Sequence, residues 1–81
     1  MLTLDMRMDI IRKQYAKEFP EQQLQSDIAR EIAELLPDAN SGELEGTLTR
    51  IVAYASLTDQ EVSVLLVRDV LNKTTGGEER L

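Results

Sequence analysis

The sequence has no cysteine and no histidine, and each absence removes a class of chemistry. Without cysteine the chain can form neither a disulfide framework nor a thiolate metal site. Without histidine it lacks the commonest general base and the usual nitrogen ligand of zinc. No Ser–His or Cys–His pair and no glycine-rich phosphate loop is present, so the sequence predicts a protein that is not an enzyme and holds no metal or cofactor.

Long apolar runs are also missing. No stretch approaches the ~20 residues that cross a membrane, and Asp5, Arg7 and Asp9 interrupt the first apolar residues, where a signal peptide needs an unbroken run. We therefore expect a soluble cytoplasmic protein. The length of 81 residues allows one domain, which we place at residues 1–73, followed by a flexible tail at residues 74–81.

Positive charge is scarce, because 9 lysine and arginine residues stand against 15 acids and give a net charge of −6. Binding to phosphates requires basic residues that displace counterions, so this balance argues against nucleic acid as a partner. The charges are also segregated: residues 1–17 carry +2, residues 18–49 carry −7 and the remainder carries −1. Such a split favours antiparallel packing of the two segments, within one chain or between two.

The first segment permits two interpretations. Its apolar residues alternate from Leu2 to Ile10, which is typical of a strand, but a helical stripe extends further, through Leu4, Met8, Ile11, Tyr15 and Phe19. Because methionine and arginine favour helix, we predict a helix over residues 5–18, with a strand at residues 2–8 as the alternative.

The second helix is predicted over residues 21–36. Pro20 suits the first turn, where its missing N–H costs nothing, and Pro37 disfavours helical geometry at the residue before it. The apolar stripe between them consists of Leu24, Ile28, Ile32 and Leu35.

The third helix is predicted over residues 41–55. Asn40 and Glu43 have the spacing of a reciprocal cap. Gly46 either weakens this helix by up to ~1 kcal/mol relative to alanine or permits close approach of another helix.

The fourth helix is predicted over residues 59–73. Thr58 and Glu61 have the spacing of a capping box, and Leu57 with Val62 would form a hydrophobic staple across it. Together the four segments predict an all-α domain, a compact four-helix bundle.

Two predicted helices carry more apolar surface than one face can bury. In the first, Leu2, Met6 and Ile10 lie opposite the main stripe; in the fourth, Val64, Val67 and Leu71 lie opposite Val62, Leu66 and Val70. Either the fourth helix is central and covered by the other three, or these faces meet a partner. We therefore treat the following as a candidate interface that completes the bundle by dimerisation: Leu2, Met6, Ile10, Val64, Val67 and Leu71.

Acidic residues of the second predicted helix share one surface. Asp27, Glu31 and Glu34 follow one another at spacings of four and three, with Arg30 among them. No second carboxylate cluster accompanies them, so a solvated acidic surface that contacts a protein partner is favoured over a metal or acid–base site.

These features predict a noncatalytic protein–protein interaction module, a small acidic adaptor, regulator or inhibitor that forms a homodimer. One alternative is a ribbon-helix-helix DNA-binding regulator, whose intermolecular strand would be residues 2–8. Another is a ubiquitin-binding module: residues 35–71 resemble the CUE family in Leu36-Pro37-Asp38, at the place of its Met-Phe-Pro turn, and in the later Leu65-Leu66 pair.

Overall fold

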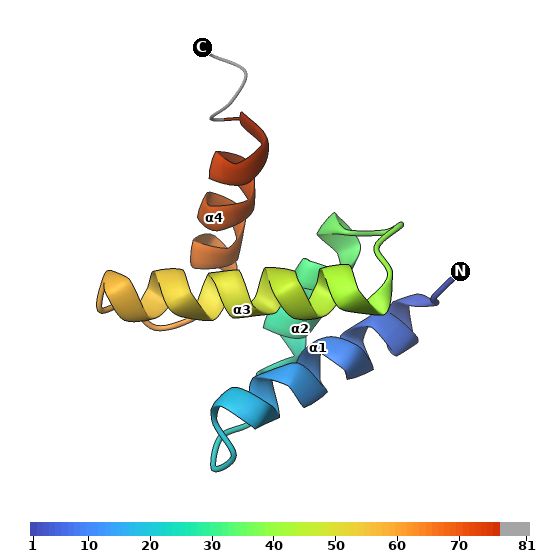
Figure 1. Ribbon diagram of the computed structural model, residues 1–81, viewed down its shortest axis with the longest axis horizontal. Helices are drawn as coiled ribbons and strands as arrows, with labels where there is room; N and C mark the ends of the chain where they lie inside the picture. Colours follow the sequence, from blue (N-terminus) through green and yellow to red (C-terminus); the bar gives the residue numbers. More distant parts are fainter. Residues whose placement is uncertain (77–81) are drawn as a thin grey trace.

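The computed structural model describes the backbone of residues 1–76 and the side chains of residues 1–72. This part of the chain is all-helical, with α1 (Leu4–Glu18), α2 (Ser26–Leu35), α3 (Ser41–Leu57) and α4 (Val64–Gly76). Figure 1 shows α3 running across the molecule, with α1 on one side and α4 leading away on the other. The predicted all-α class with four helices is confirmed, whereas dimerisation is not shown.

Among the described residues, no other helix contributes as many buried residues to the core as α3. Its buried residues are Leu44, Thr47, Leu48, Ile51, Val52 and Ala55. They pack against Ile11 and Tyr15 of α1, Ile28 and Ile32 of α2, and Leu66, Val67 and Val70 of α4. The radius of gyration of 12.2 Å equals the ~12 Å expected for a folded chain of this length. The fourth helix is therefore not the central one.

The first helix resolves the question raised by the alternating residues. Thr3 caps it, because its hydroxyl oxygen accepts the Met6 N–H at 3.1 Å, and the helix begins at Leu4. No strand occurs in residues 1–76. The ribbon-helix-helix alternative is therefore wrong, since residues 4–8 are already helical.

The second helix begins later than predicted, at Ser26 instead of residue 21, and ends at Leu35. Residues 19–25 form a linker in which Leu24 is only 4% exposed. Residues 20–21 form a turn and residues 22–25 are irregular, so a buried Leu24 in a linker replaces the first turn of helix predicted after Pro20. The prediction for this boundary was wrong.

The third helix has the predicted cap. The Asn40 side chain accepts the Glu43 N–H at 2.8 Å, and the Glu43 carboxylate accepts the Asn40 N–H at 2.9 Å. The helix continues past residue 55 to Leu57 and ends with Asp59 in a left-handed conformation (φ 58°).

The capping box predicted at Thr58 is wrong. Thr58 ends α3 instead, and its hydroxyl donates to the Tyr54 carbonyl at 2.8 Å. The fourth helix begins at Val64, capped by Ser63, whose Oγ accepts the Leu66 N–H at 3.1 Å. It continues past residue 73 to Gly76, so the predicted tail is helical over residues 74–76; residues 77–81 lie outside the described part.

None of the helices in residues 1–76 is long and apolar enough to span a membrane.

Candidate functional site

The predicted apolar interface is divided by the fold. Val67 is fully buried and belongs to the core of the chain itself, so assigning it to an exposed interface was wrong. Leu2, Ile10, Val64 and Leu71 are half-buried and also pack against the core. Only Met6 stays largely in solvent, with 49% of its surface exposed.

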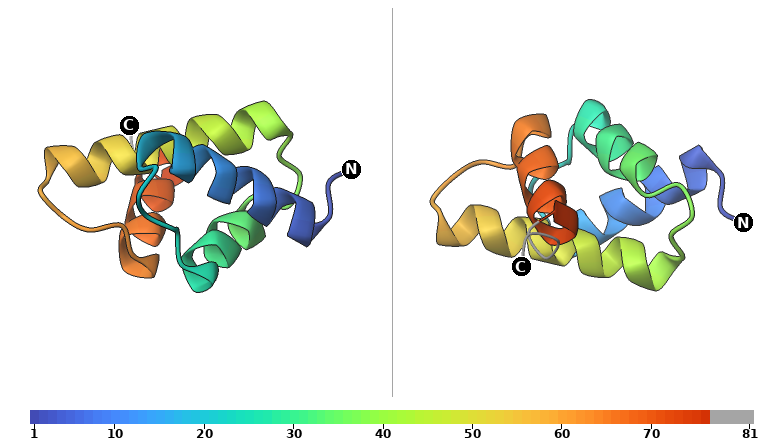
Figure 2. Two further views of the ribbon diagram at one scale, coloured as in Figure 1. Left: turned by 90° about the horizontal axis from the view of Figure 1, so that it is seen from below. Right: turned by 90° about the horizontal axis from the view of Figure 1, so that it is seen from above.

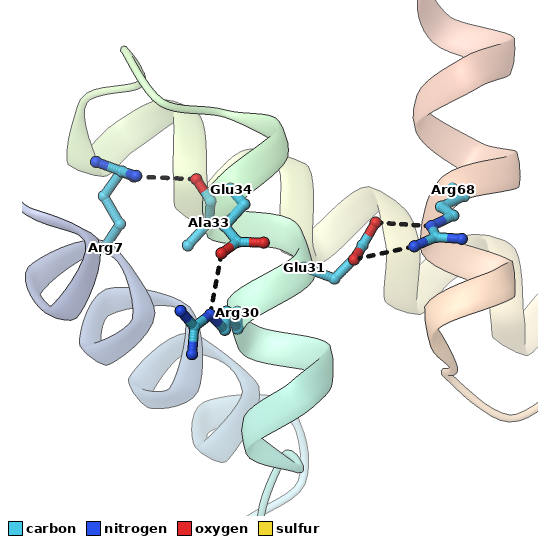
Figure 3. Close-up of polar contacts among 6 residues, drawn as sticks. All are labelled: Arg7, Arg30, Glu31, Ala33, Glu34 and Arg68. Carbon is cyan, nitrogen blue, oxygen red and sulfur yellow. Dashed lines mark hydrogen bonds and ion pairs between the residues drawn. The ribbon is translucent and has the colours of Figure 1, made fainter.

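The three acids predicted to form a partner surface all accept hydrogen bonds within the chain, and Figure 3 shows two of them, Glu31 and Glu34. Glu31 accepts hydrogen bonds from Arg68 Nε at 2.8 Å and Nη2 at 3.4 Å, which ties α2 to α4. Glu34 accepts from Arg30 Nε at 3.0 Å. Asp27 accepts the Ile28 N–H at 2.9 Å in the first turn of α2. The hydrogen bond and charge of Glu31 raise the pKa of Arg68, so this cation stays charged throughout the physiological range.

Arg7 is a basic residue that the sequence did not mark as structural. Its side chain is buried, and it donates from Nε to the Ala33 carbonyl at 3.1 Å and from Nη1 to the Leu2 carbonyl at 2.8 Å. A cation at the last turn of α2 complements the negative end of that helix (Figure 3). Arg7 therefore joins α1 to α2 and cannot serve an outside ligand.

The remaining described basic residues sort into paired and unpaired groups. Lys13 pairs with Asp9 at 3.1 Å, and Arg30 and Arg68 have the carboxylates given above. Three exposed cations, Arg12, Lys17 and Arg50, have no ion pair or hydrogen bond within the described residues.

Two of the three unpaired cations lie on one helix. Arg12 and Lys17 belong to the second half of α1, and both are exposed, as is Lys13 between them in the sequence. We call Arg12, Lys13 and Lys17 the basic end of α1. The positive charge of residues 1–17 indicated this basic surface in the sequence. We interpreted that charge instead as favouring packing against the acidic second segment. In the structure no ion pair joins α1 to α2; each described pair lies within a helix or joins α2 to α4.

The described residues hold no cluster of three or more carboxylates placed for a metal ion. That the protein has no metal, no cofactor and no catalytic activity stays a prediction.

Comparison with known proteins shows that the chain is similar to a replication initiator protein. The chain is 43% identical over 56 residues to the chromosomal replication initiator protein DnaA of Magnetococcus marinus. The alignment covers 65% of this chain and 12% of the initiator, so the chain spans only a small part of the length of that relative. No protein-family model matches the chain. No solved structure matches it significantly.

The similarity corrects two predictions. An adaptor, regulator or inhibitor acting only on proteins is the wrong interpretation, because the relative is a protein of chromosome replication. The argument against nucleic acid as a partner is overturned by the same finding. Net charge describes the whole chain, whereas contact with DNA uses a local surface. The comparisons give no support to the CUE-like alternative.

Proposed function

We propose that this chain is a DNA-contacting helical module of the replication-initiator type. The observation that carries the proposal is the 43% identity over 56 residues with DnaA of Magnetococcus marinus. Because the alignment covers 12% of that protein, the proposal concerns one module and assigns no other activity of an initiator to this chain.

The basic end of α1 supports the proposal. Arg12 and Lys17 are exposed and lack carboxylate partners among the described residues, so contact with a phosphate would break no internal ion pair. Among the described residues Lys13 pairs with the exposed Asp9, and such surface pairs contribute little to stability. Together the three side chains can neutralise about three phosphates, which predicts a slope of about −2 to −3 in a plot of log K against log salt.

The acidic composition does not prevent such contact. Glu31 is already neutralised by Arg68, and Glu34 by Arg30. The molecule is 37 Å long, and the Debye length at 0.1 M salt is about 10 Å, so acids at its far end are largely screened from a phosphate at α1. We therefore expect weak, salt-sensitive affinity for DNA.

The proposal is tested by fluorescence anisotropy of a labelled duplex between about 25 and 200 mM salt. Arg12→Gln and Lys17→Gln are each expected to weaken binding and to lower the salt slope by roughly one. Arg30→Gln is the matched control, because it removes the same charge from an exposed residue of α2 that already has a carboxylate partner.

Equal losses of affinity in all three variants would mean that net charge determines binding, and α1 would then not be the contact surface. No binding of the intact chain at the lowest salt concentration would overturn the proposal.

A further inference from the structure

A cleft of about 860 Å³ lies where the linker of residues 19–25 meets the linker of residues 58–63. Figure 2 (left) shows the two linkers approaching the first turn of α4 from opposite sides. The volume of the cleft is within the range of small-molecule binding sites in proteins. The lining is unusual in its polar groups, because every glutamine of the chain except Gln14 faces this cleft; these are Gln22, Gln23, Gln25 and Gln60.

Two of these amides are held by neighbours in complementary ways. The Tyr15 hydroxyl donates to Gln22 Oε1 at 3.2 Å, so the amide nitrogen of Gln22 is left to donate. Gln60 Nε2 donates to Thr58 Oγ1 at 2.9 Å, so its amide oxygen is left to accept. The cleft therefore presents a donor from one linker and an acceptor from the other.

The floor of the cleft is apolar and includes an aromatic ring. Phe19 is half-buried, lies 5.0 Å from the Tyr15 ring between centroids, and lines the cleft with Ile28 and Val52. A flat ring placed on Phe19 would bury apolar area in the same cleft that the amides line.

The charges of the cleft are negative. Asp27 and Glu61 line it, and none of its described lining residues is basic. An anionic ligand would be repelled, so a phosphate or a carboxylate is disfavoured here.

We propose that this cleft binds an uncharged planar ring with donor and acceptor groups on one edge, which is the chemistry of a nucleobase. Amide side chains recognise base edges with paired hydrogen bonds, and aromatic side chains stack on bases. The ring could belong to a free nucleoside, or to an unpaired base of a single strand whose phosphates stay outside the cleft, away from Asp27 and Glu61. The inference does not rest on the contact of α1 with DNA.

The test is an NMR titration of the full ¹⁵N-labelled chain with each of the four common nucleosides, with adenosine monophosphate, and with a short single-stranded oligonucleotide. Binding is expected to shift the side-chain amide resonances of Gln22 and Gln60. Adenosine is expected to bind more tightly than its monophosphate, because the phosphate would approach Asp27 and Glu61. Shifts caused by the nucleosides identify a free ligand, and shifts caused only by the oligonucleotide identify an unpaired base; both outcomes support the site.

Gln22→Leu and Gln60→Leu should each weaken binding about three- to tenfold, the effect of one lost hydrogen bond. Gln14→Leu is the control, since Gln14 lies outside the cleft and donates to Thr49 at 3.4 Å. The backbone spectrum of each variant verifies that it is folded. The proposal is overturned if neither nucleosides nor the oligonucleotide shift the two amides at about 10 mM, or if the monophosphate binds more tightly than adenosine.

Discussion

Gly46 should limit the stability of this protein, and replacing it by alanine should stabilise the fold. It lies in the interior of α3, the helix with the largest share of the buried residues, and it is exposed. A Cβ atom built at this position meets no atom within 4 Å. The close helix approach considered from the sequence is therefore not the reason for this glycine.

The magnitude follows from helix propensity. Glycine in a helix interior costs up to ~1 kcal/mol relative to alanine, mainly because it loses more backbone entropy on folding. With no new contact to offset the gain, Gly46→Ala should raise the free energy of unfolding by about 0.5–1 kcal/mol. For a domain of this size, that corresponds to an increase in Tm of roughly 2–8 °C. Urea denaturation followed by circular dichroism measures the change, and the m-value should stay the same.

Gly42→Ala is the control within the same helix. Gly42 lies in the first turn, where its Cβ would be 3.5 Å from Asn40 Oδ1, an ordinary contact. We expect a smaller gain there, because fewer backbone hydrogen bonds depend on the first turn. An unchanged or lower Tm for Gly46→Ala would refute the reasoning. It would show that the fold requires a residue without a side chain at position 46.

Two further substitutions test local features. Asp59→Gly should raise the free energy of unfolding by up to about 1 kcal/mol, because Asp59 has a φ of 58°, which glycine adopts freely. Asp59→Ala should give no such gain, and a gain with alanine would contradict this explanation. Arg7→Met should lower the free energy of unfolding, measured by urea denaturation, by about 2–3 kcal/mol, because it leaves the Ala33 and Leu2 carbonyls without their charged donor. A loss below about 0.5 kcal/mol would mean that water replaces the guanidinium as the donor to these carbonyls.

Local chemistry allowed two helices to be predicted closely. The reciprocal cap of Asn40 and Glu43 needs only neighbouring residues, and it forms as predicted. The stripe of α1 depends on periodicity, and two of its five members, Ile11 and Tyr15, are buried. Both signals are short-range, so no knowledge of the remaining chain was needed.

The two wrong boundaries have a tertiary cause. Thr58 has the residue type and spacing of an N-cap, but α3 continues to Leu57. The chain then changes direction over residues 58–63 before Ser63 caps α4. In the linker before α2, burial of Leu24 against the core outweighs the helix-starting preference of Pro20. A local signal competes here with the burial of apolar surface, and the burial prevails.

By itself, the sequence determined the helical class, the number of helices and the polarity of each segment, because these follow from the spacing of apolar residues and the charges between them. Only the tertiary structure decided which charges are used internally. Arg7 is buried against carbonyls and Arg68 is tied to Glu31, whereas Arg12 and Lys17 stay in solvent. The glutamines of two linkers share one cleft for the same reason: residues distant in the chain meet only when the core is packed.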